Sequence, residues 1–242
     1  FTGSNFIVNK ANMGNEMMPI ISSWANGSHG LDALLNIWNV VLGAAVFFLA
    51  RVLGNLYFIN RINDAPLTIR CRKTLRIDTV AFLVFFLAFV IRTLLSNGFA
   101  VDPGTEVIYM EPYKYLTNFL EMPVVAILFL IGVVLVLWGI GKTIFSTSYT
   151  KGIWFTGFGT VFTVLALLLT AGYNHTSYYP STADLQSSLT LANSCSSEFT
   201  LKTMAYVSIL VPFVLAYIVY AWRAIDNKKI DTKELKEDGH SY

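Results

Sequence analysis

The sequence predicts an all-α, polytopic membrane protein, and three observations predict it. Of 242 residues, 55% are hydrophobic and only 13% are charged, whereas soluble domains carry about 25% charged residues. The mean hydropathy is +0.56 over the whole chain. At least five runs reach the roughly 20 apolar residues that a membrane-spanning helix needs. These values exclude a disordered chain, a nucleic-acid-binding arm and an ordinary cytosolic enzyme.

Five membrane-spanning helices are predicted from these runs. The first passes through the apolar stretch 40–49 and the second through 81–90. The third starts at Pro123, and proline suits a helix start because its missing N–H would be unpaired there anyway. All five runs are apolar around their whole circumference, which suits lipid or neighbouring helices better than a soluble core. Their predicted bounds are 34–58, 79–95, 123–140, 154–173 and 204–222.

Lys and Arg alternate between the connections. Residues 61–78 contain five of them and the segment after residue 222 another five, whereas 174–201 contains none. Connections with a basic excess are cytoplasmic, so we predict that the start of the chain is outside and its tail inside. The chain is then divided into an extracytoplasmic loop at 1–33, a five-helix transmembrane region at 34–222 and a cytoplasmic tail at 223–242.

The connection 174–201 is rich in Ser and Thr and matches neither a low-complexity linker nor a helix. We therefore predict an ordered cap over the outer ends of the spans. The two cysteines, Cys71 and Cys195, would lie on opposite sides of the membrane. They would be too far apart for a disulfide, and both are interpreted as structural.

No catalytic residue, cofactor-binding residue or metal site is predicted within this chain. A membrane haem protein needs His or Met ligands at a suitable depth. His29 and His175 fall near the outer ends of spans, and His240 falls in the tail. The sequence also lacks the motifs of phosphate-binding loops, nucleophile elbows and zinc proteases.

Three polar residues inside the spans are the candidate intramembrane contacts. Arg51 sits about two turns from the inner end of the first span, and Arg92 about one turn from the outer end of the second. Asn55 lies one turn from Arg51 on the same helix face, where the two can share a polar pocket. A charge in hydrocarbon usually faces a partner or a wet cavity, so either arginine can contact a propionate, a quinone or a carboxylate on another subunit. The alternative for both is snorkelling to the lipid headgroups.

The most specific motifs lie in the last third of the chain. Ala171-Gly172 is followed by Tyr-Pro-Ser-Thr at 179–182, by Ser-Leu-Thr-Leu-Ala-Asn-Ser at 188–194, and by Val-Pro-Phe-Val-Leu-Ala-Tyr at 211–217. These stretches resemble subunit II of the cytochrome bd quinol oxidases. The specific resemblance includes 196–201 and Met204, and weaker matches extend it over most of the chain, at 36–43, Gly54, Tyr57, Arg61, 122–123 and 240–242.

The resemblance implies a particular arrangement of the spans. The family's subunit II has nine transmembrane helices, in two four-helix bundles with one peripheral helix. The five spans look like helices five to nine, which implies a four-helix transmembrane bundle plus one further transmembrane helix. About four helices would then precede this chain, in agreement with the odd number of spans, the predicted outside start and the first residue, Phe1. The family's proton-path residues lie in that preceding part, so none is transferred to a position here.

The resemblance also implies a function. The family's oxidases are electrogenic quinol:oxygen oxidoreductases of aerobic respiration, which oxidise quinol, reduce dioxygen to water and build a proton gradient. Haem b, haem d and the quinol-oxidising loop belong to subunit I. This chain is therefore expected to ligate no cofactor and to dock on and shield the haem-bearing subunit I, as one half of a heterodimer in the bacterial cytoplasmic (inner) membrane. Membrane lipids, a small single-span accessory subunit and a structural quinone or lipid are the other partners that the resemblance allows. Arg51, Arg92 and Cys195 match no motif of the family.

Two other functions are kept as alternatives. A small-solute transporter would have broken helices or ionisable residues near the membrane midplane, and only Arg51 and Arg92 point that way. A membrane assembly protein of an unrelated family makes no specific demand on the sequence. Co-purification with a haem protein would distinguish the oxidase subunit from both.

Overall fold

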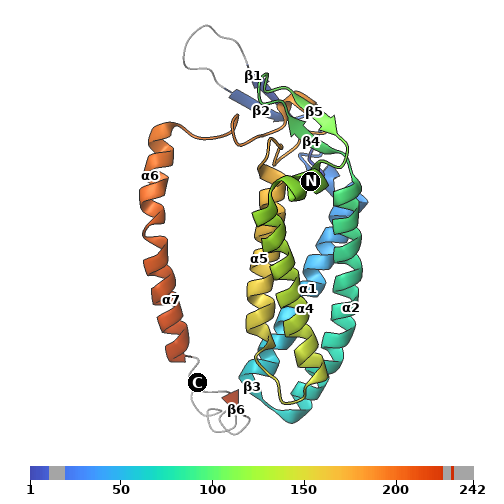
Figure 1. Cartoon of the computed structure of the whole chain (residues 1–242), viewed down its shortest axis with the longest axis vertical. Coiled ribbons are helices and arrows are strands. Elements are labelled where there is room, and N and C mark those ends of the chain that lie inside the picture. The colour runs from blue at the N-terminus through green and yellow to red at the C-terminus, as the bar shows by residue number, and fades with distance from the viewer. Residues whose placement is uncertain (11–19, 226–229, 232–242) are drawn as a thin grey trace.

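Long helices dominate the computed structural model, which describes residues 1–10, 20–225 and 230–231 (Figure 1). Four of them lie side by side as a bundle: α1 (Ile37–Arg61), α2 (Ala65–Leu95), α4 (Pro123–Phe145) and α5 (Gly152–Gly172). Each is long and apolar enough to cross a membrane, as is the segment Glu198–Ala224. This confirms the prediction of an all-α polytopic membrane protein with five spans.

The fifth span stands apart from the bundle. It consists of α6 (Glu198–Ser208) and α7 (Val211–Ile225), drawn in orange and red at the left of Figure 1. The apolar window of this span buries none of its residues within the chain. The interruption between the two helices coincides with Pro212, which has no N–H to continue the hydrogen-bond ladder. The predicted four-helix bundle plus one further helix is therefore the observed arrangement.

The start of α2 differs from the prediction. This helix begins at Ala65, not Thr79, because Asp64 caps it by accepting a hydrogen bond from the N–H of Leu67, 2.7 Å away. Pro66 then occupies the first turn, where proline is well tolerated. The basic segment predicted as a connection is thus mostly helix, and it forms one end of the bundle. We call this end, with the α1–α2 and α4–α5 turns, the basic end.

The opposite end carries short strands, and we call it the strand end. There, β1 (Phe6–Lys10) pairs with β2 (Ile20–Trp24), and β4 (Gly98–Val101) pairs with β5 (Ile108–Glu111), both antiparallel. The first hairpin was not predicted, because 1–33 was interpreted as a loop. At the turn after β4, hydrogen bonds from the Gly104 N–H and the Thr105 hydroxyl hold the pKa of Asp102 below its ordinary value.

The 174–201 connection closes the strand end, as predicted for an ordered cap. Two β-bridges attach it to the rest of this end, Ser4 to Ser181 and Ala100 to Thr176, and a third, Tyr179 to Leu189, lies within the connection itself. The short helices η1 (Leu31–Leu35), α3 (Lys114–Glu121) and η2 (Leu185–Ser187) complete this end. At the basic end, β3 (Ile62–Asn63) runs parallel to β6 (Ile230–Asp231). Most of the predicted cytoplasmic tail, 223–242, lies outside the described residues.

Candidate functional site

An ion pair joins α1 to α2 inside the bundle. The Nε of Arg51 donates a hydrogen bond to Oδ2 of Asp78 over 3.1 Å, and the side-chain amide of Asn55 donates to the same oxygen, also over 3.1 Å. The Asp78 side chain is 2% exposed, whereas that of Arg51 is 47% exposed and lies over the ring of Phe47. Arg51 and Asn55 therefore share one partner, the carboxylate of Asp78.

The depth of this pair follows from Arg72, on the same helix as Asp78. The Arg72 guanidinium is buried and donates to four backbone carbonyls at the end of α4 and in the turn after it, those of Thr143, Ser146, Thr147 and Tyr149. Arg72 thus marks the level at which α4 ends. Asp78 lies six residues further along α2, or about 9 Å at 1.5 Å per residue. The ion pair is therefore about two turns inside the spans.

Asp78 was missed by sequence reasoning. It directly precedes the apolar run of the second span, so it was assigned to a connection in which an acid needs no partner. The signal that could have found it was the pairing requirement of Arg51, since an arginine within a span usually faces an acid or a cavity. Asp64 is nearer to Arg51 in the sequence, but Asp78 directly precedes the apolar run of the neighbouring span.

Arg92 is not part of this cluster. It belongs to the last turn of α2, at the strand end, and its guanidinium lies 5.6 Å from the ring centre of Trp38 at the start of α1. The contact is a cation–π interaction. The structure thus places the two predicted arginines at different depths and with different partners.

The histidines lie far from the ion pair. His29 and His175 are both at the strand end and both have left-handed backbone conformations, with φ of 50° and 53°. His240 lies outside the described residues. Among 1–10, 20–225 and 230–231, no three His, Cys, Asp or Glu side chains are grouped as a metal site would require.

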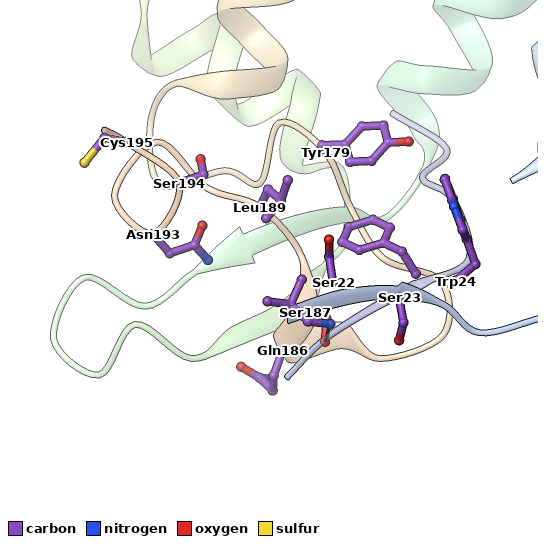
Figure 2. A pocket seen from close by; sticks show the side chains of 12 residues that line it. Ser22, Ser23, Trp24, Tyr179, Gln186, Ser187, Leu189, Asn193, Ser194 and Cys195 are labelled. Atoms are coloured by element: carbon purple, nitrogen blue, oxygen red, sulfur yellow. Dashed lines mark hydrogen bonds between the residues drawn. The ribbon is translucent and has the colours of Figure 1, made fainter. Parts of the chain in front are cut away.

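A cavity of about 480 Å³ opens in the cap at the strand end. Figure 2 shows its walls, with Trp24 on one side and Asn193, Ser194 and Cys195 on a loop at the other. Several polar groups in these walls already have partners within the chain. For example, the Ser187 hydroxyl donates to Asp184 and accepts from the N–H of Val8, and the Gln186 amide makes two hydrogen bonds to the backbone of Ile108. We interpret this cavity as part of the folded cap.

Comparison with known proteins decides the family. The model of the family described as cytochrome bd terminal oxidase subunit II matches residues 6–225. The chain belongs to this family. It is also 24% identical, over 225 residues, to cytochrome bd-I ubiquinol oxidase subunit 2 of Escherichia coli strain K12 and to the same protein of strain O157:H7. Each alignment covers 87% of this chain but 55% of the relative, so the chain spans about half the length of the curated relatives it matches.

The residues that carry the resemblance to subunit II lie mainly at the strand end and in α7. Ala171-Gly172 ends α5, 179–182 and 188–194 form the cap, and 211–217 forms the first half of α7. In this cytochrome bd subunit II chain, the Arg51–Asp78 pair sits near the other end of the bundle, away from these motifs.

Proposed function

We propose that this chain is a non-haem-ligating, membrane-embedded part of subunit II in a cytochrome bd-type terminal oxidase. The complex would oxidise quinol, reduce dioxygen to water and generate a proton gradient, as an electrogenic quinol:oxygen oxidoreductase. Haem b and haem d would be held by subunit I, and this chain would dock on that subunit and shield it from lipid. Family membership supports the proposal, and the relative from Escherichia coli strain K12 is a subunit of a ubiquinol oxidase.

The half-exposed Arg51 is the observation that carries the docking role. Its two Nη groups have no hydrogen-bond partner among the described residues, although Nε is bonded to Asp78. Exposing a guanidinium to hydrocarbon at this depth is costly. A neighbouring protein surface over Arg51 would remove that cost. Since Asp78 already neutralises the charge, the neighbour needs to offer neutral acceptors, such as carbonyl oxygens, and not a second acid.

Replacing Arg51 tests this docking face. Arg51→Leu alone leaves the buried Asp78 carboxylate without its cation, so the variant is combined with Asp78→Asn to keep the bundle neutral. We expect the double variant to accumulate in the membrane but to retain less haem per tagged chain than the wild type. Haem is measured by the absorption spectrum after purification from native membranes. Arg92→Leu is the matched control, since it removes the other intramembrane arginine at the opposite end of the bundle.

Two results of this purification would contradict the proposal. If the double variant and the wild type retain equal haem, Arg51 does not lie in the docking face. If the wild-type chain purifies alone, stable and colourless, the subunit assignment itself fails. Identification of the co-purifying chains also tests the proposed partners, namely subunit I and a small single-span accessory subunit.

We further propose that the basic end faces the cytoplasm of a bacterium and that the membrane is its cytoplasmic (inner) membrane. The positive-inside rule supports this orientation. The two free cysteines provide a test, because Cys195 is exposed near the strand end and Cys71 is buried near the basic end. We expect a membrane-impermeant maleimide to label Cys195 in intact spheroplasts. The Cys195→Ser variant should not be labelled, and labelling of wild type only after lysis would reverse the orientation.

A structural quinone or lipid bound within the subunit is the remaining part of the proposal. No cofactor ligand is assigned to a residue of this chain.

A further inference from the structure

The bundle consists of two tight helix hairpins that pack loosely on each other. Contacts within the pairs α1–α2 and α4–α5 are far more extensive than the contacts α1–α5 and α2–α4 between them. The hairpins are joined firmly at the basic end, where Arg72 binds the α4–α5 turn and a core that includes Leu56, Leu75 and Ile140 is buried. They are joined again at the strand end through α3, which contacts α2 as well as α4 and α5 and whose Asn118 amide donates to the Thr170 carbonyl of α5 over 2.9 Å.

A cavity of about 290 Å³ lies between these two joints. Its walls come from all four bundle helices, including Leu49 of α1, Phe86 of α2, Val133 of α4 and Thr163 of α5. The α2 residues that line it, 82–90, are about 15 to 27 Å along the helix from Arg72. The cavity is therefore in the middle of the spans, at the depth of the hydrocarbon core.

The lining offers no charge and no free polar group. Its hydroxyls belong to Thr160 and Thr163, and each donates within its own helix, to the carbonyls of Thr156 and Gly159, over 2.8 Å. Such an apolar cavity does not hold water, and an empty one destabilises a fold in proportion to its volume. A polar headgroup would find no partner here. The chemistry that fits this lining is therefore that of a hydrocarbon.

We propose that this cavity binds one acyl chain of a membrane phospholipid. Leu87 and Leu137, on α2 and α4, line the cavity and stay 51% and 44% exposed, so the cavity is open toward the surface of the bundle. Acyl chains are the apolar molecules that surround a membrane protein at this depth. The chain inserts between the hairpins and completes their packing, while its headgroup stays outside the cavity.

Filling the cavity tests the proposal. Val133→Phe puts a larger side chain into the lining, and Val134→Phe makes the same change at a neighbouring α4 position that is 62% exposed and outside the cavity. Both are purified as the whole oxidase complex, and the retained phospholipid and quinone are counted by mass spectrometry. We expect retained phospholipid in the Val133→Phe complex to fall by about one molecule relative to wild type, because the cavity has no room for both. The Val134→Phe complex should match wild type.

Equal phospholipid in both variants and wild type overturns the proposal, as does loss of a quinone instead of a phospholipid. If the Val133→Phe complex does not assemble, the wild-type complex is used to test the proposal. It is reconstituted with phosphatidylglycerol carrying brominated acyl chains, and bromine density between α2 and α4 is expected in a cryo-microscopy map. Absence of bromine there overturns the proposal.

The inference rests on the proposed function only because the experiment uses the purified oxidase complex. A colourless preparation contradicts the function, whereas a coloured complex without this lipid contradicts the inference alone.

Discussion

Arg72→Ala is expected to destabilise the bundle by about 3 kcal/mol, because it removes the buried guanidinium that hydrogen-bonds four carbonyls at the α4–α5 turn, and a buried acceptor that loses its partner costs roughly 1–3 kcal/mol. The guanidinium bonds to Ser146 and Thr147, both over 2.8 Å, to Tyr149 over 3.1 Å, and to the buried carbonyl of Thr143. It also lies at the C-terminus of α4, where a positive charge interacts favourably with the negative end of the helix dipole. A loss of about 3 kcal/mol lowers the melting temperature of a chain of this size by roughly 6–12 °C.

The control for this prediction is on the same helix. Arg70 is exposed, so Arg70→Ala should change stability by less than about 0.5 kcal/mol. Both variants are compared by the temperature at which the detergent-solubilised complex loses its monodisperse peak on size exclusion. Arg72→Lys should fall near the alanine variant, since a lysine has one compact charge and cannot present a planar fork to four carbonyls. Equal melting temperatures for the Arg72 and Arg70 variants would show that the hydrogen bonds from Arg72 to the α4–α5 turn do not stabilise the bundle.

The sequence predicted the spans because apolar runs have to cross the bilayer as helices, and that requirement is local. The predicted start of the second span was wrong because Arg72 and Asp78 of α2 are charged and yet buried within the helix. Their burial is made possible by carbonyls of the α4–α5 turn and by Arg51 of α1. No sliding window of hydropathy contains those partners, which are 27 to 77 positions away.

The candidate site, too, could be predicted from the sequence only in part. Arg51 and Asn55 could be identified because they interrupt an apolar run one turn apart, and the helix period places them on one face. Asp78 was not assigned to them because it was interpreted as part of a connection, although the pairing requirement of Arg51 pointed to an acid on a neighbouring helix. The position of α6 and α7 outside the bundle was implied by the resemblance to subunit II and not by the apolar pattern, because the sequence of an apolar helix does not distinguish lipid from protein as its surroundings.

The second large effect is expected at the contact of α4 with α5. Gly132 and Gly139 of α4 face Gly152 and Gly159 of α5, and each pair repeats at an interval of seven residues. A Cβ added to Gly139 would lie 2.7 Å from the carbonyl oxygen of Gly152, and one added to Gly159 would lie 2.6 Å from that of Gly132. Small residues allow membrane helices to approach so closely that backbone contacts and packing hold them together.

We therefore expect Gly139→Ala and Gly159→Ala each to cost about 3 kcal/mol, the upper end for overpacking, because backbone atoms of the facing helix are in the way at both positions, together with the Thr156 hydroxyl at Gly139. The double variant should cost less than the sum, since helices already separated by one methyl group have room for the next. Gly141 on α4 and Gly157 on α5 have no atom within 4 Å of an added Cβ. There the same substitution should raise stability by about 0.5–1 kcal/mol, because alanine is the better helix former. The two sets should thus shift the melting temperature in opposite directions, and a shift of the same sign in both would mean that the glycines are not what brings α4 and α5 together.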